Sequence, residues 1–421
     1  MQFIFSHSNT PDECVRKIAQ NVNLLVFNYY TIRDIIKKEQ RGVCMKQGFR
    51  FLSFLLITIL FVAACSNNSS ADNIVTDNTD ITGTTENDVT NKTSEELKED
   101  KEAMNTEEVN INEPVEEGEH FIKTTFVSEA LLSAKDGSSN EKKLYIYLPP
   151  NYYKSDKRYP VIYYFHGFGD PMNFITNNKN ALDTNMLLPE NKEFIVVEVD
   201  GSRASRSEGS FWVNSPVTGL WEDYIVKEIV SYIDENYRTI AKAEARGTAG
   251  YSMGGFASLN LALAHPDVFS STISFCPGVL KKGSLQLAMD SWKGDGLFLR
   301  CYGQTFAPNE AKDNMCDIPT LDGSAEDNII VEKWENGFGN FDQKLDNYIA
   351  KNKPLKAIHV VYGTYDHYKW IVEGCEDLSE LMTAKGIEHT LTKLQIGHTP
   401  PPEQVGKYIV PFFSTNLVFN E

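Results

Sequence analysis

Aromatic residues are missing from one long stretch of this sequence: Ser66 to Gly118 contains no phenylalanine, tryptophan or tyrosine. Asparagine, threonine and acidic residues dominate the stretch, with fifteen acidic residues against three lysines. A segment of this composition cannot bury enough apolar surface to offset the entropy lost on ordering it. We therefore predict a disordered acidic tether over residues 65–118 and a single folded domain over residues 119–421, where aromatic and aliphatic residues are dense.

The sequence also lacks a hydrophobic run long enough to span a membrane. The apolar run from Phe51 to Val62 has about a dozen residues, whereas a transmembrane helix needs about twenty. Basic residues precede it and small residues followed by Cys65 end it, a pattern that resembles a bacterial lipoprotein signal peptide over residues 45–64. An ordinary signal peptide or a short anchor is the alternative. Because such a signal normally starts a chain, we predict that residues 1–44 are a spurious N-terminal extension.

The lipoprotein interpretation implies that Cys65 carries a lipid and that the protein is exported and anchored at the outer face of a bacterial membrane. An exported protein could form disulfides, and four cysteines allow three connectivities. The sequence cannot choose among these connectivities, and it leaves the oligomeric state open. The four cysteines that remain after Cys65 are Cys276, Cys301, Cys316 and Cys375.

Basic surface and metal-binding motifs are absent as well. The net charge is −18, and no stripe of lysine or arginine could neutralise phosphates, so a nucleic-acid partner is not expected. No C-x-x-C or H-E-x-x-H motif occurs, so the sequence gives no support to a zinc site. We expect chemistry that needs neither a metal nor another cofactor.

What the sequence does contain is a glycine-rich turn, Gly247-Thr-Ala-Gly-Tyr-Ser-Met-Gly-Gly255, between a short buried strand and a helix of small residues. Side chains at Gly250 or Gly254 would collide with the neighbouring strand and helix, which explains the G-x-S-x-G spacing. Ser252 is then placed as a nucleophile in a strained turn, and the N–H of Met253 is placed to stabilise an oxyanion. G-x-S-x-G also occurs by chance around an ordinary serine, so residues elsewhere that could act together with Ser252 must decide whether it is a nucleophile.

Strand and helix patterns alternate through the rest of the domain, which predicts a mostly parallel, doubly wound α/β sheet. Two strands over residues 121–131 and 143–148 are expected to pair antiparallel at a sheet edge. Residues 277–352 have a weak pattern, and we interpret them as an insertion that roofs the site. The other expected strands are 159–165, 194–199, 246–249, 268–275, 357–362 and 389–394, and the expected helices are 221–237, 256–265, 370–385 and 404–413.

A serine nucleophile needs a base that removes its proton and a carboxylate that orients the base. His398 lies in the loop after the last predicted strand, where loops from the carboxyl ends of parallel strands converge. Asp366 stands directly beyond an earlier strand end at the same edge. The order Ser252, Asp366, His398 matches that of α/β-hydrolases. The alternatives are an ordinary loop histidine and a turn aspartate.

A second short segment, His166-Gly-Phe-Gly-Asp170, directly follows the strand that ends at Phe165. The second oxyanion-hole amide of this fold comes from that position, and the glycines let the backbone approach a substrate. We therefore assign the two oxyanion donors to the N–H groups of Phe168 and Met253. His166 is interpreted as a structural residue that orients the loop.

The same region carries further short motifs: Tyr147-Leu-Pro-Pro-Asn-Tyr152, Trp221-Glu-Asp-Tyr224, Asn236-Tyr-Arg238, His265-Pro-Asp-Val-Phe269 and Gly397-His398. With the two glycine-rich segments, they resemble the esterase D family of α/β-hydrolases. That family includes feruloyl and acetyl-xylan esterases, S-formylglutathione hydrolases, enterochelin esterases and mycolyltransferases of the antigen 85 type. The resemblance covers residues 144–413 and departs from the family between residues 276 and 355. It implies an α/β-hydrolase fold, the same triad and the same two oxyanion amides.

The expected function is that of an extracellular serine carboxylesterase acting on an ester substrate linked to plant polysaccharide, of feruloyl or acetyl-xylan type. Trp212 and Tyr365 are candidate substrate contacts because aromatic rings stack on sugar or aryl groups. Trp221 and Trp370 could do the same, although at helix starts they fit the core equally well. Siderophore ester hydrolysis and acyl transfer are the enzymatic alternatives. A surface-anchored binding protein on a hydrolase scaffold is the non-enzymatic one.

Overall fold

The computed structural model describes residues 119–420. Four predictions fall on residues outside this range: the spurious extension over residues 1–44, the signal peptide over residues 45–64, the lipidated Cys65 and the acidic tether. Within residues 119–420, none of the helices is both long enough and apolar enough to cross a membrane.

One large sheet organises the described part of the chain. Its eight strands follow the order β1-β2-β4-β3-β7-β8-β9-β10, and all neighbours from β4 to β10 run parallel. The first two strands pair antiparallel at one edge, as predicted. The strands are β1 (Phe121–Val127), β2 (Glu141–Tyr147), β3 (Val161–Phe165), β4 (Ile195–Val199), β7 (Arg246–Tyr251), β8 (Ser271–Phe275), β9 (Ala357–Gly363) and β10 (Thr390–Leu394).

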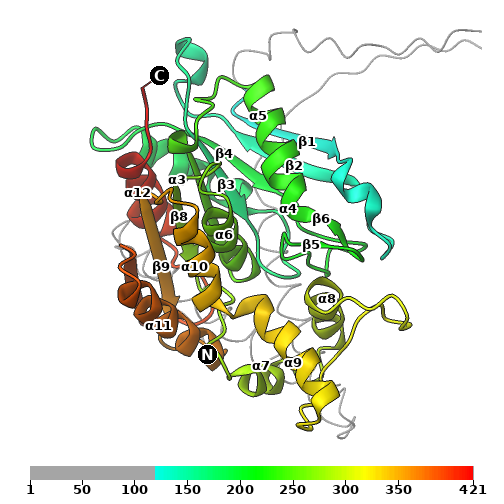
Figure 1. Ribbon diagram of the computed structural model, residues 1–421. Coiled ribbons are helices and arrows are strands. Elements are labelled where there is room, and N and C mark those ends of the chain that lie inside the picture. The colour runs from blue at the N-terminus through cyan, green and yellow to red at the C-terminus, as the bar shows by residue number, and fades with distance from the viewer. Residues whose placement is uncertain (1–118, 421) are drawn as a thin grey trace, which may run out of the picture. The chain divides into compact units, whose positions relative to one another are not determined.

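Helices cover both faces of this sheet, which confirms the doubly wound α/β-hydrolase fold (Figure 1). Side chains of β3 alternate between the two faces: Val161 and Tyr163 belong to one core cluster and Ile162 and Tyr164 to the other. The first cluster is covered by α4 (Trp221–Asp223), the π-helical η3 (Tyr224–Ile229), α5 (Val230–Asn236), α6 (Met253–Ala264) and α11 (Lys369–Ala384). The second is covered by α3 (Phe174–Met186), the π-helical η5 (Gln404–Ile409) and α12 (Val410–Asn416).

Two elements differ from the sequence expectation. Strand β1 ends at Val127, and Leu131 instead fills a buried position in a 3-10 turn, η1 (Ala130–Ser133). The apolar pattern therefore continued past the true strand end. Helix α3 was not predicted, because its polar sequence buries only four side chains and gives little apolar periodicity. A two-stranded hairpin, β5 (Asn214–Ser215) and β6 (Gly219–Leu220), completes the strands that the structure describes.

The segment over residues 277–352 is helical rather than irregular. It forms α7 (Leu285–Trp292), α8 (Gly296–Phe306), α9 (Ala325–Phe338) and α10 (Phe341–Ala350). Figure 1 shows α7, α8 and α9 gathered beyond one end of the sheet. Aromatic packing holds them together, since the ring of Tyr302 lies within 5.2 Å of the rings of Trp292, Trp334 and Phe338. A fully buried ion pair between Arg203 and Asp136 accompanies a hydrogen bond from Arg203 to Gln304, which ties α8 to the main domain.

Candidate active site

Ser252 occupies the sharp turn between β7 and α6. Its backbone has φ 57° and ψ −114°, a region that side chains other than glycine rarely adopt. Two hydrogen bonds fix the turn: Ser252 N–H donates to the carbonyl of Phe275 at 2.9 Å, and Gly278 N–H donates to the carbonyl of Ser252 at 3.1 Å. The strained turn expected from the sequence is therefore present, and it is anchored to the end of β8.

The two flanking glycines of the motif are required by close backbone contacts. A Cβ atom on Gly250 would lie 2.1 Å from the carbonyl oxygen of Gly254. A Cβ atom on Gly254 would lie 2.0 Å from the carbonyl oxygen of Phe165 in β3. These are the collisions with strand and helix that the spacing predicted, so the glycines are needed for the close approach of α6 to the sheet.

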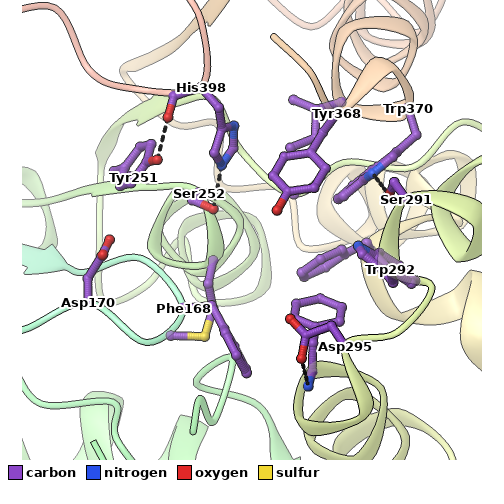
Figure 2. Close-up of a pocket in the computed structure, with 15 residues that line it drawn as sticks. Phe168, Asp170, Tyr251, Ser252, Ser291, Trp292, Asp295, Tyr368, Trp370 and His398 are labelled. Atoms are coloured by element: carbon purple, nitrogen blue, oxygen red, sulfur yellow. Dashed lines mark hydrogen bonds between the residues drawn. The ribbon is translucent and has the colours of Figure 1, made fainter. Parts of the chain in front are cut away.

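The structure brings Ser252, Asp366 and His398 together. Nε2 of His398 lies 2.9 Å from Oγ of Ser252 (Figure 2). Nδ1 of His398 lies 2.7 Å from Oδ2 of Asp366. Asp366 is completely buried, and its other oxygen accepts the N–H of Tyr368 at 2.8 Å. With Nδ1–H donating to the carboxylate, Nε2 is left to accept the serine hydroxyl. The three residues meet because β7, β9 and β10 are parallel and end at one edge.

Tyr251, which precedes Ser252 in the glycine-rich turn, contacts His398, and the sequence does not predict this contact. The hydroxyl of Tyr251 donates to the carbonyl oxygen of His398 at 2.5 Å, and the two rings lie 5.2 Å apart. Both residues line the same pocket. The only available signal was the place of Tyr251 between Gly250 and Ser252, which by itself does not predict a contact with a loop 147 residues away.

The two residues assigned as oxyanion donors also line the pocket. The backbone N–H groups of Phe168 and Met253 donate to no other residue in the described part of the chain, and Met253 is the first residue of α6. His166 holds the adjacent loop: its Nδ1 bonds to the carbonyl of Gly167 at 2.8 Å, and its Nε2 accepts the N–H of Gly201 at 2.9 Å. The assignment of Phe168 and Met253 as oxyanion donors stays a prediction.

The pocket has a volume of about 250 Å³ and is roofed by the 277–352 segment, as predicted. Ser252 and His398 lie on one side of it, and Ser291, Trp292 and Asp295 lie on the other (Figure 2). Phe298 of α8 and Phe338, the last residue of α9, also line it. The lining residues are Phe168, Asp170, Tyr251, Ser252, Met253, Gly278, Ser291, Trp292, Asp295, Phe298, Phe338, Tyr368, Trp370, Ile371 and His398.

The structure corrects the predicted substrate contacts. Trp212 is 0% exposed and packs its ring on Phe165 and His166, so it belongs to the core and does not reach the pocket. Tyr365 is 66% exposed but is not among the lining residues. Of the two tryptophans left open, Trp221 is core and Trp370 lines the pocket.

The four cysteines are buried free thiols, so none of the three possible disulfide connectivities is formed. Cys276 lies beside the triad: its Sγ, a carboxylate oxygen of Asp366 and a ring nitrogen of His398 lie within 4.8 Å of one another. Burial raises the pKa of the Cys276 thiol to about 12, which keeps the thiol protonated at neutral pH. Asp366 and His398 are already bonded to each other, so this group is an acid–base pair with a neighbouring neutral thiol.

Fold and geometry together define an α/β-hydrolase with a serine at the nucleophile position. A family model named Esterase matches residues 138–380, and the chain belongs to that family. An esterase of Mycobacterium tuberculosis is 33% identical over 134 residues, which is 31% of this chain and 27% of that protein. An endo-1,4-beta-xylanase/feruloyl esterase of Xylanibacter ruminicola is 31% identical over 131 residues, 30% of this chain and 18% of that protein. The chain therefore spans about a quarter or less of the length of these relatives.

Solved structures with a similar fold include a ferulic acid esterase, with a TM-score of 0.49 and 18% identity over 70% of this chain and 97% of that one. An S-formylglutathione hydrolase from Agrobacterium tumefaciens has a TM-score of 0.46 and 15% identity, over 71% of this chain and 95% of that one. A ferulic acid esterase from Anaeromyces mucronatus, solved in complex with ferulic acid, has a TM-score of 0.45 and 19% identity, over 71% of this chain and 93% of that one.

Proposed function

We propose that this protein is a serine carboxylesterase whose triad is Ser252, His398 and Asp366. The observation that carries the proposal is the unbroken path of hydrogen bonds from Oγ of Ser252 through the imidazole to a fully buried carboxylate. A protein that only bound ligands would need no such path. Membership of the Esterase family supports the same conclusion.

In the proposed mechanism, Nε2 of His398 accepts the hydroxyl proton as Oγ of Ser252 attacks the ester carbonyl carbon. Asp366 keeps the proton of the ring on Nδ1 and stabilises the imidazolium that forms. The free N–H groups of Phe168 and Met253 receive the negative charge of the carbonyl oxygen. The alcohol leaves with the proton from Nε2. Water, deprotonated by the same nitrogen, then releases the acid from Ser252.

The proposed substrates are extracellular esters linked to plant polysaccharide, of feruloyl or acetyl-xylan type. Support comes from the aromatic lining of the pocket and from the feruloyl esterase activity named for the Xylanibacter ruminicola relative. The sequence signal over residues 45–64 adds the proposal that the protein is exported and held at the outer face of the membrane by a lipid on Cys65. Incorporation of labelled palmitate into the wild type but not into Cys65→Ala would test the anchor.

The activity is tested by hydrolysis of p-nitrophenyl acetate by the purified wild type and by Ser252→Ala. We expect the variant to lose at least about 10³-fold in kcat, because the nucleophile is removed while the fold is kept. Ser231→Ala is the matched control, since Ser231 is an exposed serine on α5 whose hydroxyl bonds only to the carbonyl of Lys227. Equal rates for the wild type and Ser252→Ala would favour the binding-protein alternative. Methyl ferulate, acetylated xylan and a triscatecholate lactone, tested side by side, then separate the substrate classes.

A further inference from the structure

Apart from the imidazole of His398, the charged side chains that line the pocket are all acidic. Two carboxylates, Asp170 and Asp295, line it, and none of the lining residues is a lysine or an arginine. Figure 2 shows the two carboxylates on opposite sides of the cavity, with Asp170 on the side of Ser252 and Asp295 on the side of Trp292. A group that enters the pocket therefore meets negative charge from both sides and fixed positive charge from neither.

The titration behaviour of the lining tyrosines agrees with this arrangement. The pKa of Tyr368 is raised by burial and by the carboxylates of Asp295 and Asp366. The pKa of Tyr251 is raised by burial first and then by nearby groups that include Asp170.

The walls of the pocket add to the same preference. Seven phenylalanine, tyrosine and tryptophan side chains line it, and the negative face of an aromatic ring attracts cations and repels anions. The ring of Trp292 contacts two of the others, with its centroid 4.8 Å from that of Phe298 and 5.3 Å from that of Trp370. The indole N–H of Trp370 is already used by Oγ of Ser291 at 3.0 Å, so it is not free to bind an anion.

Asp295 is held in place by the helix that it starts. Its side chain accepts the N–H of Phe298 at 2.9 Å as the N-cap of α8, and Phe298 is itself a lining residue. Asp295 is an exposed residue that lines the cavity. Asparagine caps a helix about as well as aspartate, so the charge can be removed while the cap is kept.

We propose that this pocket selects esters by charge, accepting neutral and cationic groups and excluding anionic ones, and that Asp295 is a specificity-determining residue. The proposal rests on the esterase function proposed above and narrows its substrate class to esters whose bound group is uncharged or carries a quaternary ammonium. Neutral hydroxycinnamoyl and acetyl esters fit this class. A ferric triscatecholate, which is an anion, does not.

The test compares kcat/KM within two pairs of p-nitrophenyl esters that differ in charge but hardly in shape. One pair is the anionic hemisuccinate and the neutral levulinate. The other is the ester of a trimethylammonium-substituted butyric acid and its neutral tert-butyl analogue. We expect the wild type to disfavour the anionic ester by about tenfold and to prefer the cationic one by a few-fold, both effects shrinking in 0.5 M salt by roughly half because salt screens exposed charges.

Asp295→Asn should change the kcat/KM ratio within each pair of esters by about three- to fivefold, in the direction of one. Asp290→Asn is the matched control: it removes the same charge from an exposed position on α7 outside the pocket and should leave both ratios unchanged. Equal kcat/KM within each pair in the wild type would overturn the proposal, as would ratios that respond equally to both variants. If the neutral esters are hydrolysed by the wild type but not by Ser252→Ala, either of these results overturns the charge selectivity and leaves the esterase function standing. Absence of all turnover would instead contradict the esterase function.

Discussion

Tyr251 and His398 are linked by a hydrogen bond of 2.5 Å from the tyrosine hydroxyl to the backbone carbonyl of the histidine. The residue next to Ser252 therefore holds the loop that carries His398. Because Tyr251 ends β7 and His398 follows β10, the bond crosses from the centre of the sheet to its edge. The position of Nε2 relative to Ser252 then depends on the nucleophile turn as well as on the loop itself.

Tyr251→Phe removes only this hydroxyl and should lower kcat by about five- to tenfold, the equivalent of one net hydrogen bond of about 1 kcal/mol. KM should change less, because the ring remains in the pocket wall. Steady-state kinetics with p-nitrophenyl acetate measures both values. Tyr365→Phe, at an exposed position outside the pocket, is the control and should behave as wild type. Identical kcat values for Tyr251→Phe and the wild type would show that the loop needs no such support.

Asp366→Asn should lower kcat by about 10³- to 10⁴-fold. An amide in place of the carboxylate favours the wrong tautomer of His398, in which Nε2 carries the proton. A protonated Nε2 cannot accept the proton of the serine hydroxyl. The rate is measured with p-nitrophenyl acetate, and binding of a fluorophosphonate probe to Ser252 reports reactivity independently. Glu373→Gln removes an acid from an exposed position on the following helix and should keep full activity. A loss smaller than tenfold in Asp366→Asn would mean that another group orients the imidazole.

Gly254→Ala should destabilise the fold by about 2–3 kcal/mol or prevent folding, because its Cβ would lie 2.0 Å from the carbonyl oxygen of Phe165, a backbone atom that cannot move freely. Urea unfolding followed by tryptophan fluorescence measures the change. Gly296→Ala is the control, since a Cβ there would meet no atom within 4 Å. Wild-type stability and activity in Gly254→Ala would show that α6 can move away from β3 without cost.

His359 should make the protein less stable in acid. Burial lowers its pKa from 6.5 to about 4, so between these values the unfolded chain binds a proton that the folded protein does not. The contribution of His359 to the free energy of unfolding is fully present above pH 6.5 and is lost as the pH falls toward 4. The loss is at most about 3 kcal/mol, and solvent screening at this partly exposed site makes it smaller.

The measurement is urea unfolding of the wild type and His359→Gln at pH 7 and pH 4.5. Glutamine keeps a partner for Thr392, whose hydroxyl lies 2.8 Å from Nε2 of His359, but does not titrate. We expect the wild type to lose more stability than the variant between the two pH values. Equal losses would mean that the folded state takes up the proton as readily as the unfolded chain.

The glycine-rich turn at Ser252 could be predicted from the sequence because its constraints leave a fixed local spacing. Gly250 is needed for a close approach to the carbonyl of Gly254, and Gly254 for a close approach to Phe165 of β3, so the two glycines flank Ser252 at a recognisable distance in the sequence. The order of strands and helices was predictable for a similar reason, since apolar runs covered on both faces mark parallel strands. Helix α3 escaped prediction because few of its side chains are buried.

Errors arose where burial depends on distant parts of the chain. Trp212 was expected to contact the substrate, but Phe211 and Trp212 both adopt positive φ values, 59° and 49°, and are fully buried. The sequence left the pairing of the cysteines open for the same reason: pairing depends on which helices and strands bring them together, and all four are buried free thiols.

By itself, the sequence determined the glycine-constrained turn at Ser252, the alternation of strands and helices, and the chain order of the three residues, because each follows from contacts between near neighbours or from periodicity. Only the tertiary structure decided that Tyr251 supports the loop of His398, that Trp370 rather than Trp212 lines the pocket, and that Asp170 and Asp295 face the same cavity. These depend on how separate elements pack across the carboxyl edge of the sheet, and packing between distant segments leaves no fixed spacing in a sequence.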